Sequence, residues 1–281
     1  MKLIADNIHK HDMLAGLWLA PFAATPKSYI YNKHKDWFVK NKNGKIPFAS
    51  HNWGGFYALD IYNNEVRQYL KEVFDAVLNV WGYDMVKLDF LYACCIIPFN
   101  GKSRGEIMCD AMDLIRELCG DKLILGCGVP LAPAFGKVDF CRIGADMALS
   151  WGKKPFSRED VSTKHALLNT IFRRELDGRA FLNDPDVFLL RDNNIKMSFE
   201  QRKLIAETAS LFGNLLFVSD DVSTYNSDQK DCFINVTTRN KADINYVNMD
   251  SDGDISIKYT LDGEKKGYCF NIDSGDKKIL I

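Results

Sequence analysis

The stretch that decides the fold is Val80–Tyr92, which reads V-W-G-Y-D-M-V-K-L-D-F-L-Y. Lys87 and Asp89 are two residues apart in it, so in an extended strand both side chains point to the same face. Burying an unpaired carboxylate is costly, so a charged pair in so apolar a strand needs a reason. Two explanations stay open at this point: a structural ion pair at a strand end, or a pair of groups that face a functional site.

Around this stretch the chain alternates between helix and strand patterns. Residues 63–80 show helical periodicity, with Val66, Leu70 and Phe74 on one face. The other expected helices are 1–12, 104–119, 158–175 and 198–211, and the other expected strands are 14–22, 122–128, 140–147, 179–182 and 214–218. Such alternation predicts a parallel β/α architecture with right-handed crossovers.

Polar residues gather at or just after the ends of these strands. They are Asp89, Cys127, Asp146, Asp184 and Asp220. In a β/α barrel these positions form the carboxyl-terminal rim, which is where active sites are built.

Two segments depart from the alternation. Residues 25–57 are too long for a simple connector and are a candidate lid or substrate-facing loop. After Val222, residues 232–248 and 255–281 show short alternating runs separated by Asp-Gly and Ser-Gly pairs, which predict an antiparallel β appendage. We therefore expect a partial β/α-barrel domain at 1–221 and a C-terminal antiparallel β domain at 222–281.

Composition narrows the partners and the compartment. The 281 residues carry 36 basic and 37 acidic side chains and a net charge of −1, which gives no field to attract nucleic acid or an anionic membrane. Asp6 lies where a signal peptide would need its apolar core, and no apolar run reaches membrane-spanning length. We expect a cytoplasmic protein that binds neither nucleic acid nor membrane.

Metal-site spacings are missing from the sequence. No cysteine pair has the C-x-x-C spacing, and the five histidines are scattered or lie on different faces of a helix. The series Asn248, Asp250, Asp252, Gly253 imitates the start of a calcium loop, but Tyr259 stands where a bidentate glutamate is required. We interpret this series as a hairpin turn and expect no metal.

Two aspartates at strand ends, each with a cation on its strand, suggest acid and nucleophile roles. Asp89 has Lys87 two residues before it, and Asp146 has Arg142 four residues before it. One ionised carboxylate can attack a carbon while a second carboxyl group protonates the leaving oxygen, as in glycoside hydrolysis. Phosphoryl transfer or a metal-dependent aldol reaction would need a phosphate-binding glycine loop or histidine ligands.

Six motifs, in order, resemble the α-galactosidases of glycoside hydrolase family 36 and the related family 27. They are LAGLWLAPF, YALDIYNNEVRQYLKEV, GYDMVKLDF, LGCGVPLAP, CRIGADM and LNDPDVFLLR, and they span roughly residues 1–222. The resemblance implies a (β/α)8 TIM-type barrel of which strands three to eight are visible, followed by a short β domain. It also implies a retaining hydrolase of terminal α-galactosides of the melibiose or raffinose type, working without a cofactor.

The same resemblance implies roles for seven residues. Asp89 matches the nucleophile and Asp146 the general acid/base, while Lys87 and Arg142 match cations that bind sugar hydroxyls and orient the carboxylates. Three further matches are substrate-binding: Trp18 suits packing on a sugar face, Cys127 lies near the sugar 2-hydroxyl, and Asp186 lines the pocket.

Other features of the sequence depart from the family pattern. The chain starts before the third strand, so it looks truncated, and a second copy or another polypeptide could supply the missing strands. Gly128 and Ala20 stand where relatives often carry acidic residues, which leaves the sugar preference open. The alternatives are a relative that cleaves or transfers another α-linked sugar, or a non-catalytic carbohydrate-binding or assembly subunit.

Overall fold

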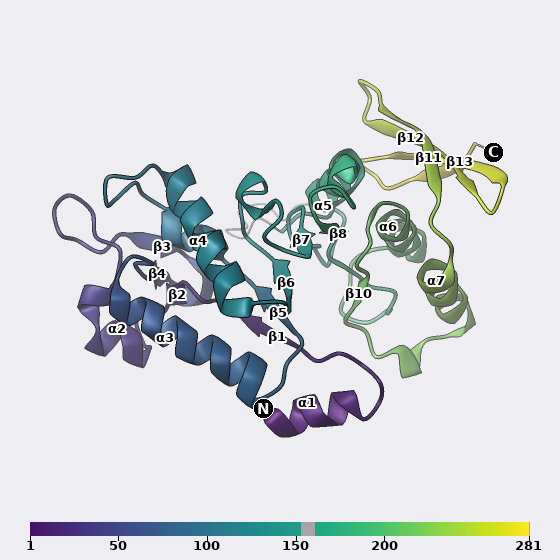
Figure 1. The fold of residues 1–281 in the computed structure, drawn as a ribbon. Coiled ribbons are helices and arrows are strands. Elements are labelled where there is room, and N and C mark those ends of the chain that lie inside the picture. The colour runs from purple at the N-terminus through teal and green to yellow at the C-terminus, as the bar shows by residue number, and fades with distance from the viewer. Residues whose placement is uncertain (153–160, 281) are drawn as a thin grey trace. The chain divides into compact units, whose positions relative to one another are not determined.

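The computed structural model describes residues 1–152 and 161–280 of the chain (Figure 1). The chain divides into two compact units, Met1–Cys141 and Arg142–Ile281.

Unit 1 is built on a parallel sheet with helices between its strands. The strand order is β1, β5, β6, β7, and their bounds are β1 Gly16–Leu19, β5 Met85–Leu88, β6 Leu123–Gly126 and β7 Phe140–Arg142. The three longer helices of the unit are α1 Lys2–His9, α3 Asn64–Asp75 and α4 Arg104–Cys119. The expected β/α alternation is therefore confirmed here, with strands shorter than the apolar runs that predicted them.

The helices of unit 1 begin where their capping residues stand. The side chain of Asn63 accepts hydrogen bonds from the backbone N–H groups of Glu65 and Val66 at the start of α3. Ser103 and Glu106 form a reciprocal capping box at the start of α4. These caps fix the ends of the helices that deliver the chain to β5 and β6.

The predicted long loop at residues 25–57 has regular structure of its own, so that expectation was incomplete. It contributes α2 Tyr29–Lys33 and two strands of a three-stranded antiparallel sheet ordered β2-β4-β3. The strands are β2 Ala23–Ala24, β3 Phe48–Ser50 and β4 Phe56–Ala58. Each strand is too short to show a period-2 pattern, which explains why sequence reading missed them.

Unit 2 continues the alternation. Ile143, next to the end of β7, donates its N–H to the carbonyl of Asp184 at 3.2 Å, and β9 pairs with β10 in parallel. The elements are α5 Thr163–Phe172, β8 Leu182–Asp184, β9 Val187–Phe188, α6 Phe199–Phe212, β10 Phe217–Val218 and α7 Ser227–Thr238. Residues 158–160 of the expected helix 158–175 lie outside the described residues.

Unit 2 ends in a four-stranded antiparallel sheet of order β11-β12-β13-β14. Its strands are β11 Asp243–Met249, β12 Asp254–Leu261, β13 Glu264–Asn271 and β14 Lys277–Ile279. The predicted hairpins are present, and Asp250 uses its carboxylate to accept the N–H groups of Asp252 and Asp254 within the first turn.

One expectation for this region is wrong. The chain from Cys232 to Thr238 is helical and not an alternating strand, because Asn226 and Gln229 form a capping box that starts α7. The domain boundary at 221/222 stays a prediction. Among the described residues, no helix is long and apolar enough to cross a membrane.

Candidate functional site

Asp89 directly follows β5 and is held by hydrogen bonds on both carboxylate oxygens. Its Oδ1 accepts the backbone N–H of Phe90 at 2.7 Å, and its Oδ2 accepts the indole N–H of Trp18 at 3.2 Å. Phe90 adopts a left-handed backbone conformation with φ 53° and ψ 33°, which is uncommon for a bulky residue. The turn at Phe90 thus fixes the direction of the Asp89 carboxylate.

Trp18 and Lys87 lie side by side next to this carboxylate. They are register partners in the parallel pairing of β1 with β5, so their side chains point to the same face of the sheet. Trp18 is 45% exposed although it is a large apolar residue. The structure therefore brings together three of the predicted residues: Trp18, Lys87 and Asp89.

Cys127 and Gly128 complete this part of unit 1. Cys127 is buried and donates its N–H to the carbonyl of Leu88 at 2.8 Å. Gly128 has φ +58°, and a Cβ placed there would lie 3.0 Å from the Phe90 nitrogen and 3.4 Å from Oδ1 of Asp89. The absence of a side chain at 128 is thus required by the close approach of the Asp89–Phe90 turn.

Sequence reasoning missed Trp53, which belongs to the same neighbourhood. Its ring packs edge-on against Trp18, with centroids 5.7 Å apart and an interplanar angle of 84°. It also packs against Phe90 with centroids 4.6 Å apart. The signal that could have pointed to it is the H-N-W-G-G run inside the long aromatic segment, because two adjacent glycines often accompany an unusual backbone path.

In unit 2, Arg142 at the end of β7 binds three carboxylates. Its distances are 2.9 Å to Asp146 Oδ1, 3.0 Å to Asp184 Oδ2 and 2.6 Å to Asp186 Oδ1. The arginine, Asp184 and Asp186 are buried, whereas the Asp146 side chain is 73% exposed. A guanidinium presents several donors in a fixed plane. Arg142 can therefore bind Asp146 at one edge while the buried carboxylates of Asp184 and Asp186 neutralise the arginine's charge.

Asp186 is placed by an unusual backbone and by burial. It has φ +82°, and its Oδ2 accepts the N–H of Met147 at 2.6 Å. Burial raises the pKa of the Asp186 carboxyl above its ordinary value, while the charge of Arg142 and the N–H groups of Met147 and Val187 act against this rise. Asp186 therefore braces the chain just after Asp146.

Asp184 is the second residue that the predicted set of site residues lacked. Its position after a strand was noted, but its role as the fully buried partner of Arg142 depends on a contact between residues 42 positions apart. Asp89 lies in unit 1 and the Arg142 cluster in unit 2. Unit 1 holds a carboxylate fixed by two hydrogen bonds, and unit 2 holds an exposed carboxylate beside a buried cation.

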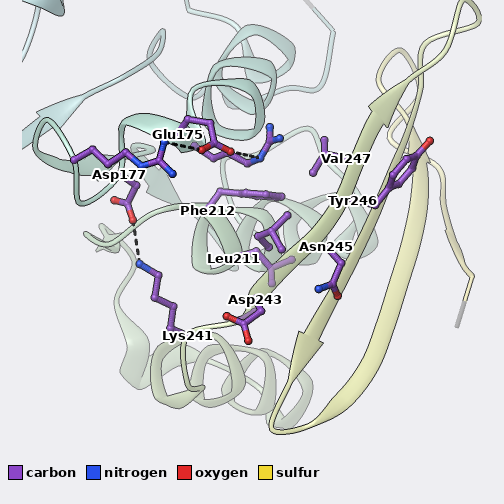
Figure 2. A pocket seen from close by; sticks show the side chains of 13 residues that line it. Glu175, Asp177, Leu211, Phe212, Lys241, Asp243, Asn245, Tyr246 and Val247 are labelled. Atoms are coloured by element: carbon purple, nitrogen blue, oxygen red, sulfur yellow. Dashed lines mark hydrogen bonds and ion pairs between the residues drawn. The ribbon is translucent and has the colours of Figure 1, made fainter.

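A cavity of about 540 Å³ in unit 2 contains none of the predicted residues (Figure 2). Most of its charged side chains bind one another: Lys241 approaches Asp177 at 3.5 Å, and Arg179 approaches Glu175 at 3.2 Å. Within the described part of the chain, no group of three or more His, Cys, Asp or Glu residues could hold a metal ion.

Comparison with known proteins finds relatives that share sequence with this chain. The melibiase family model matches residues 1–102. A bifunctional α-galactosidase/sucrose kinase from Mediterraneibacter gnavus is 28% identical over 127 residues, which cover 44% of this chain and 13% of that protein. An A type blood α-D-galactosamine galactosaminidase from Flavonifractor plautii is 26% identical over 110 residues, covering 37% and 10% of the two chains.

Solved structures extend the likeness over more of the chain. The α-galactosidase of Thermus thermophilus in complex with p-nitrophenyl α-D-galactopyranoside has a TM-score of 0.81 and 29% identity, covering 94% of this chain and 54% of that one. Its complex with stachyose gives a TM-score of 0.77 and 31% identity, covering 85% and 52%. The chain thus spans about half of that enzyme and a smaller share of the curated relatives.

These matches agree on the fold and on the kind of protein to which the chain is similar. The fold is that of an α/β-barrel glycoside hydrolase followed by an antiparallel β-sheet, as the sequence predicted. Residues 1–102 match the melibiase model, and the chain is similar to α-galactosidases in sequence and in structure.

Proposed function

We propose that this protein hydrolyses terminal α-galactosides with retention of anomeric configuration. The observation that carries the proposal is the carboxylate of Asp89, held by Trp18 and by the Phe90 N–H at the end of β5 in a chain related to α-galactosidases. A nucleophilic carboxylate must be ionised and correctly oriented. The hydrogen-bond donors on both oxygens of Asp89 orient it without using a metal.

In the proposed first step, a carboxylate oxygen of Asp89 attacks the anomeric carbon while the bond to the leaving oxygen breaks. Asp146 gives its proton to that oxygen. In the second step Asp146 removes a proton from water, whose oxygen displaces Asp89 from the sugar. In enzymes of this mechanism the two carboxyl groups work about 5–5.5 Å apart.

Arg142 supports the role proposed for Asp146. Asp184 and Asp186 are buried beside the arginine, so its charge is largely compensated by two carboxylates before Asp146 is counted. Asp146 remains exposed and is held at a single oxygen, which leaves its other oxygen accessible to a leaving group. Lys87, Trp18 and Cys127 are proposed to bind the sugar.

A relative acting on an amino sugar is the second candidate. The observation favouring it is the match to a galactosaminidase together with the missing side chain at Gly128. A glycine at this position presents no acidic group to a 2-hydroxyl.

A panel of nitrophenyl glycosides tests the proposal and separates the candidates. The substrates are the α-galactoside, the α-N-acetylgalactosaminide, the β-L-arabinopyranoside and the α-glucoside. The highest kcat/KM is expected for the α-galactoside, and a higher value for the N-acetylated sugar would favour the second candidate. Light scattering on the same sample tests the predicted homo-oligomer or partner requirement.

A further inference from the structure

We infer that Trp53 is a positioning residue for Asp89, acting through both hydrogen-bond donors that hold the carboxylate. The inference rests on the proposed function. Its starting point is that an indole 52% exposed to solvent stands on a backbone with φ 56° and ψ 28°. Left-handed backbone at a bulky residue is energetically unfavourable and persists only where the surroundings enforce it.

The backbone around Trp53 is shaped to present the ring. Gly54 and Gly55 follow with φ +78° and +110°, so three consecutive residues have positive φ. A Cβ on Gly55 would lie 2.5 Å from the ring of Phe48, so a residue with a side chain would clash at that position. The loop between β3 and β4 is therefore built around one conformation of Trp53.

The contacts of Trp53 converge on Asp89. Trp18, whose indole N–H binds Oδ2, meets the Trp53 ring edge-on at 5.7 Å. Phe90, whose backbone N–H binds Oδ1, meets it at 4.6 Å and 70°. Both are the edge-to-face geometries that aromatic rings prefer, so each contact restrains the orientation of its partner.

Buried neighbours fix Trp53 in turn. Phe56 on β4 is fully buried and packs against both Trp53 and Phe90, with centroids 5.5 Å and 5.3 Å apart. The segment 25–57 thus reaches the turn after β5 through a rigid aromatic cluster. Trp53 links that cluster to the two donors of the carboxylate.

The first test measures the hydrogen bond itself and does not depend on activity. In protein labelled with 15N-tryptophan, Trp18→Phe identifies the Trp18 indole signal, and its exchange with water is then measured. Asp89→Ala removes the acceptor and should speed this exchange. Trp53→Ala should speed it too, whereas Tyr29→Ala, which removes an aromatic 72% exposed in the same segment, should not.

The double variant distinguishes positioning from simple covering. If Trp53 acts through the bond to Asp89, Trp53→Ala adds little exchange to a protein that already carries Asp89→Ala. The inference would be overturned if the exchange rate in the double variant rose by the product of the two single effects. It would also be overturned if Trp53→Ala left the exchange rate of the Trp18 indole unchanged. Because no substrate is involved, this result stands even if the proposed function fails.

The second test is kinetic. On nitrophenyl α-D-galactopyranoside, Trp53→Ala should lower kcat about tenfold and leave KM within about twofold, since loss of two aromatic contacts misaligns the nucleophile. Trp53→Phe, which keeps an aromatic ring, should recover most of kcat. A changed KM with unchanged kcat would assign Trp53 to substrate binding and refute positioning.

Discussion

Replacing Gly128 by alanine probes the close approach beneath the Asp89 turn. Alanine at φ +58° costs about 1–2 kcal/mol in backbone energy. Its Cβ would lie 3.0 Å from the nitrogen and 3.1 Å from the Cα of Phe90, backbone atoms that cannot rotate away. Overpacking of this kind adds about 1–3 kcal/mol, so we expect a total of about 2–5 kcal/mol divided between lost stability and a displaced turn.

Displacement of the turn should be visible in the kinetics. The same Cβ would stand 3.4 Å from Oδ1 of Asp89, so relief of the contact at Phe90 moves the carboxylate with it. A nucleophile misplaced by a fraction of an ångström should lower kcat on nitrophenyl α-D-galactopyranoside by roughly 10–100-fold. Thermal unfolding followed by circular dichroism measures the stability loss on the same samples.

Gly136→Ala is the matched control. Gly136 has φ +68°, but an ideal Cβ there meets no heavy atom within 4 Å. This variant should lose only the backbone contribution to stability and keep kcat within about twofold. Equal stability losses and equal kcat values for Gly128→Ala and Gly136→Ala would refute the claim that position 128 is restricted by the Asp89 turn.

Three further predictions concern charged groups. Asp146→Ala should lower kcat/KM far more for melibiose than for a nitrophenyl galactoside, since an activated phenol scarcely needs protonation; equal losses would exclude the acid role. Arg142→Lys should destabilise the protein by about 3–5 kcal/mol in urea unfolding, because an ammonium cannot satisfy its three carboxylates; an unchanged midpoint would contradict this. Burial raises the pKa of Asp84, but hydrogen bonds from His9 and the Ala15 N–H outweigh this effect and hold the pKa below its ordinary value. That stabilisation is present above the ordinary pKa of an aspartate and is lost as pH falls through the lower folded-state pKa, so Asp84→Asn should cost about 1 kcal/mol near neutrality and progressively less in acid. A cost that is independent of pH in thermal melts would show that the charge of Asp84 does not matter.

Elements with a local signature could be predicted from the sequence. Three helices have a capping residue next to clear 3.6-residue periodicity, and all three are present. Their capping residues are Asn63, Ser103 and Ser198. The helix α7 was missed because its two buried apolar side chains, Cys232 and Val236, are too few to distinguish it from an alternating strand. The short strands of the 25–57 segment leave no period to detect.

Part of the candidate site could likewise be predicted from the sequence, and part could not. Positions at strand ends are visible in the sequence, which is how Asp89 and Asp146 were found. Contacts between distant residues are not visible: Trp18 binds Asp89 across 71 positions, and Arg142 binds Asp184 across 42. Trp53 depends on a left-handed backbone that no pattern of apolar residues encodes.

The most direct test of the central claim is replacement of the Asp89 carboxylate. Asp89→Asn should abolish hydrolysis of nitrophenyl α-D-galactopyranoside, while Asp75→Asn, at an exposed position on α3, should not change it. Circular dichroism confirms that both variants are folded. The small variant Asp89→Gly, supplied with azide as an external nucleophile, should release nitrophenol and form β-galactosyl azide, the product of a single inversion. Wild-type turnover by Asp89→Asn, or α-galactosyl azide from Asp89→Gly, would contradict the assignment of Asp89 as the nucleophile.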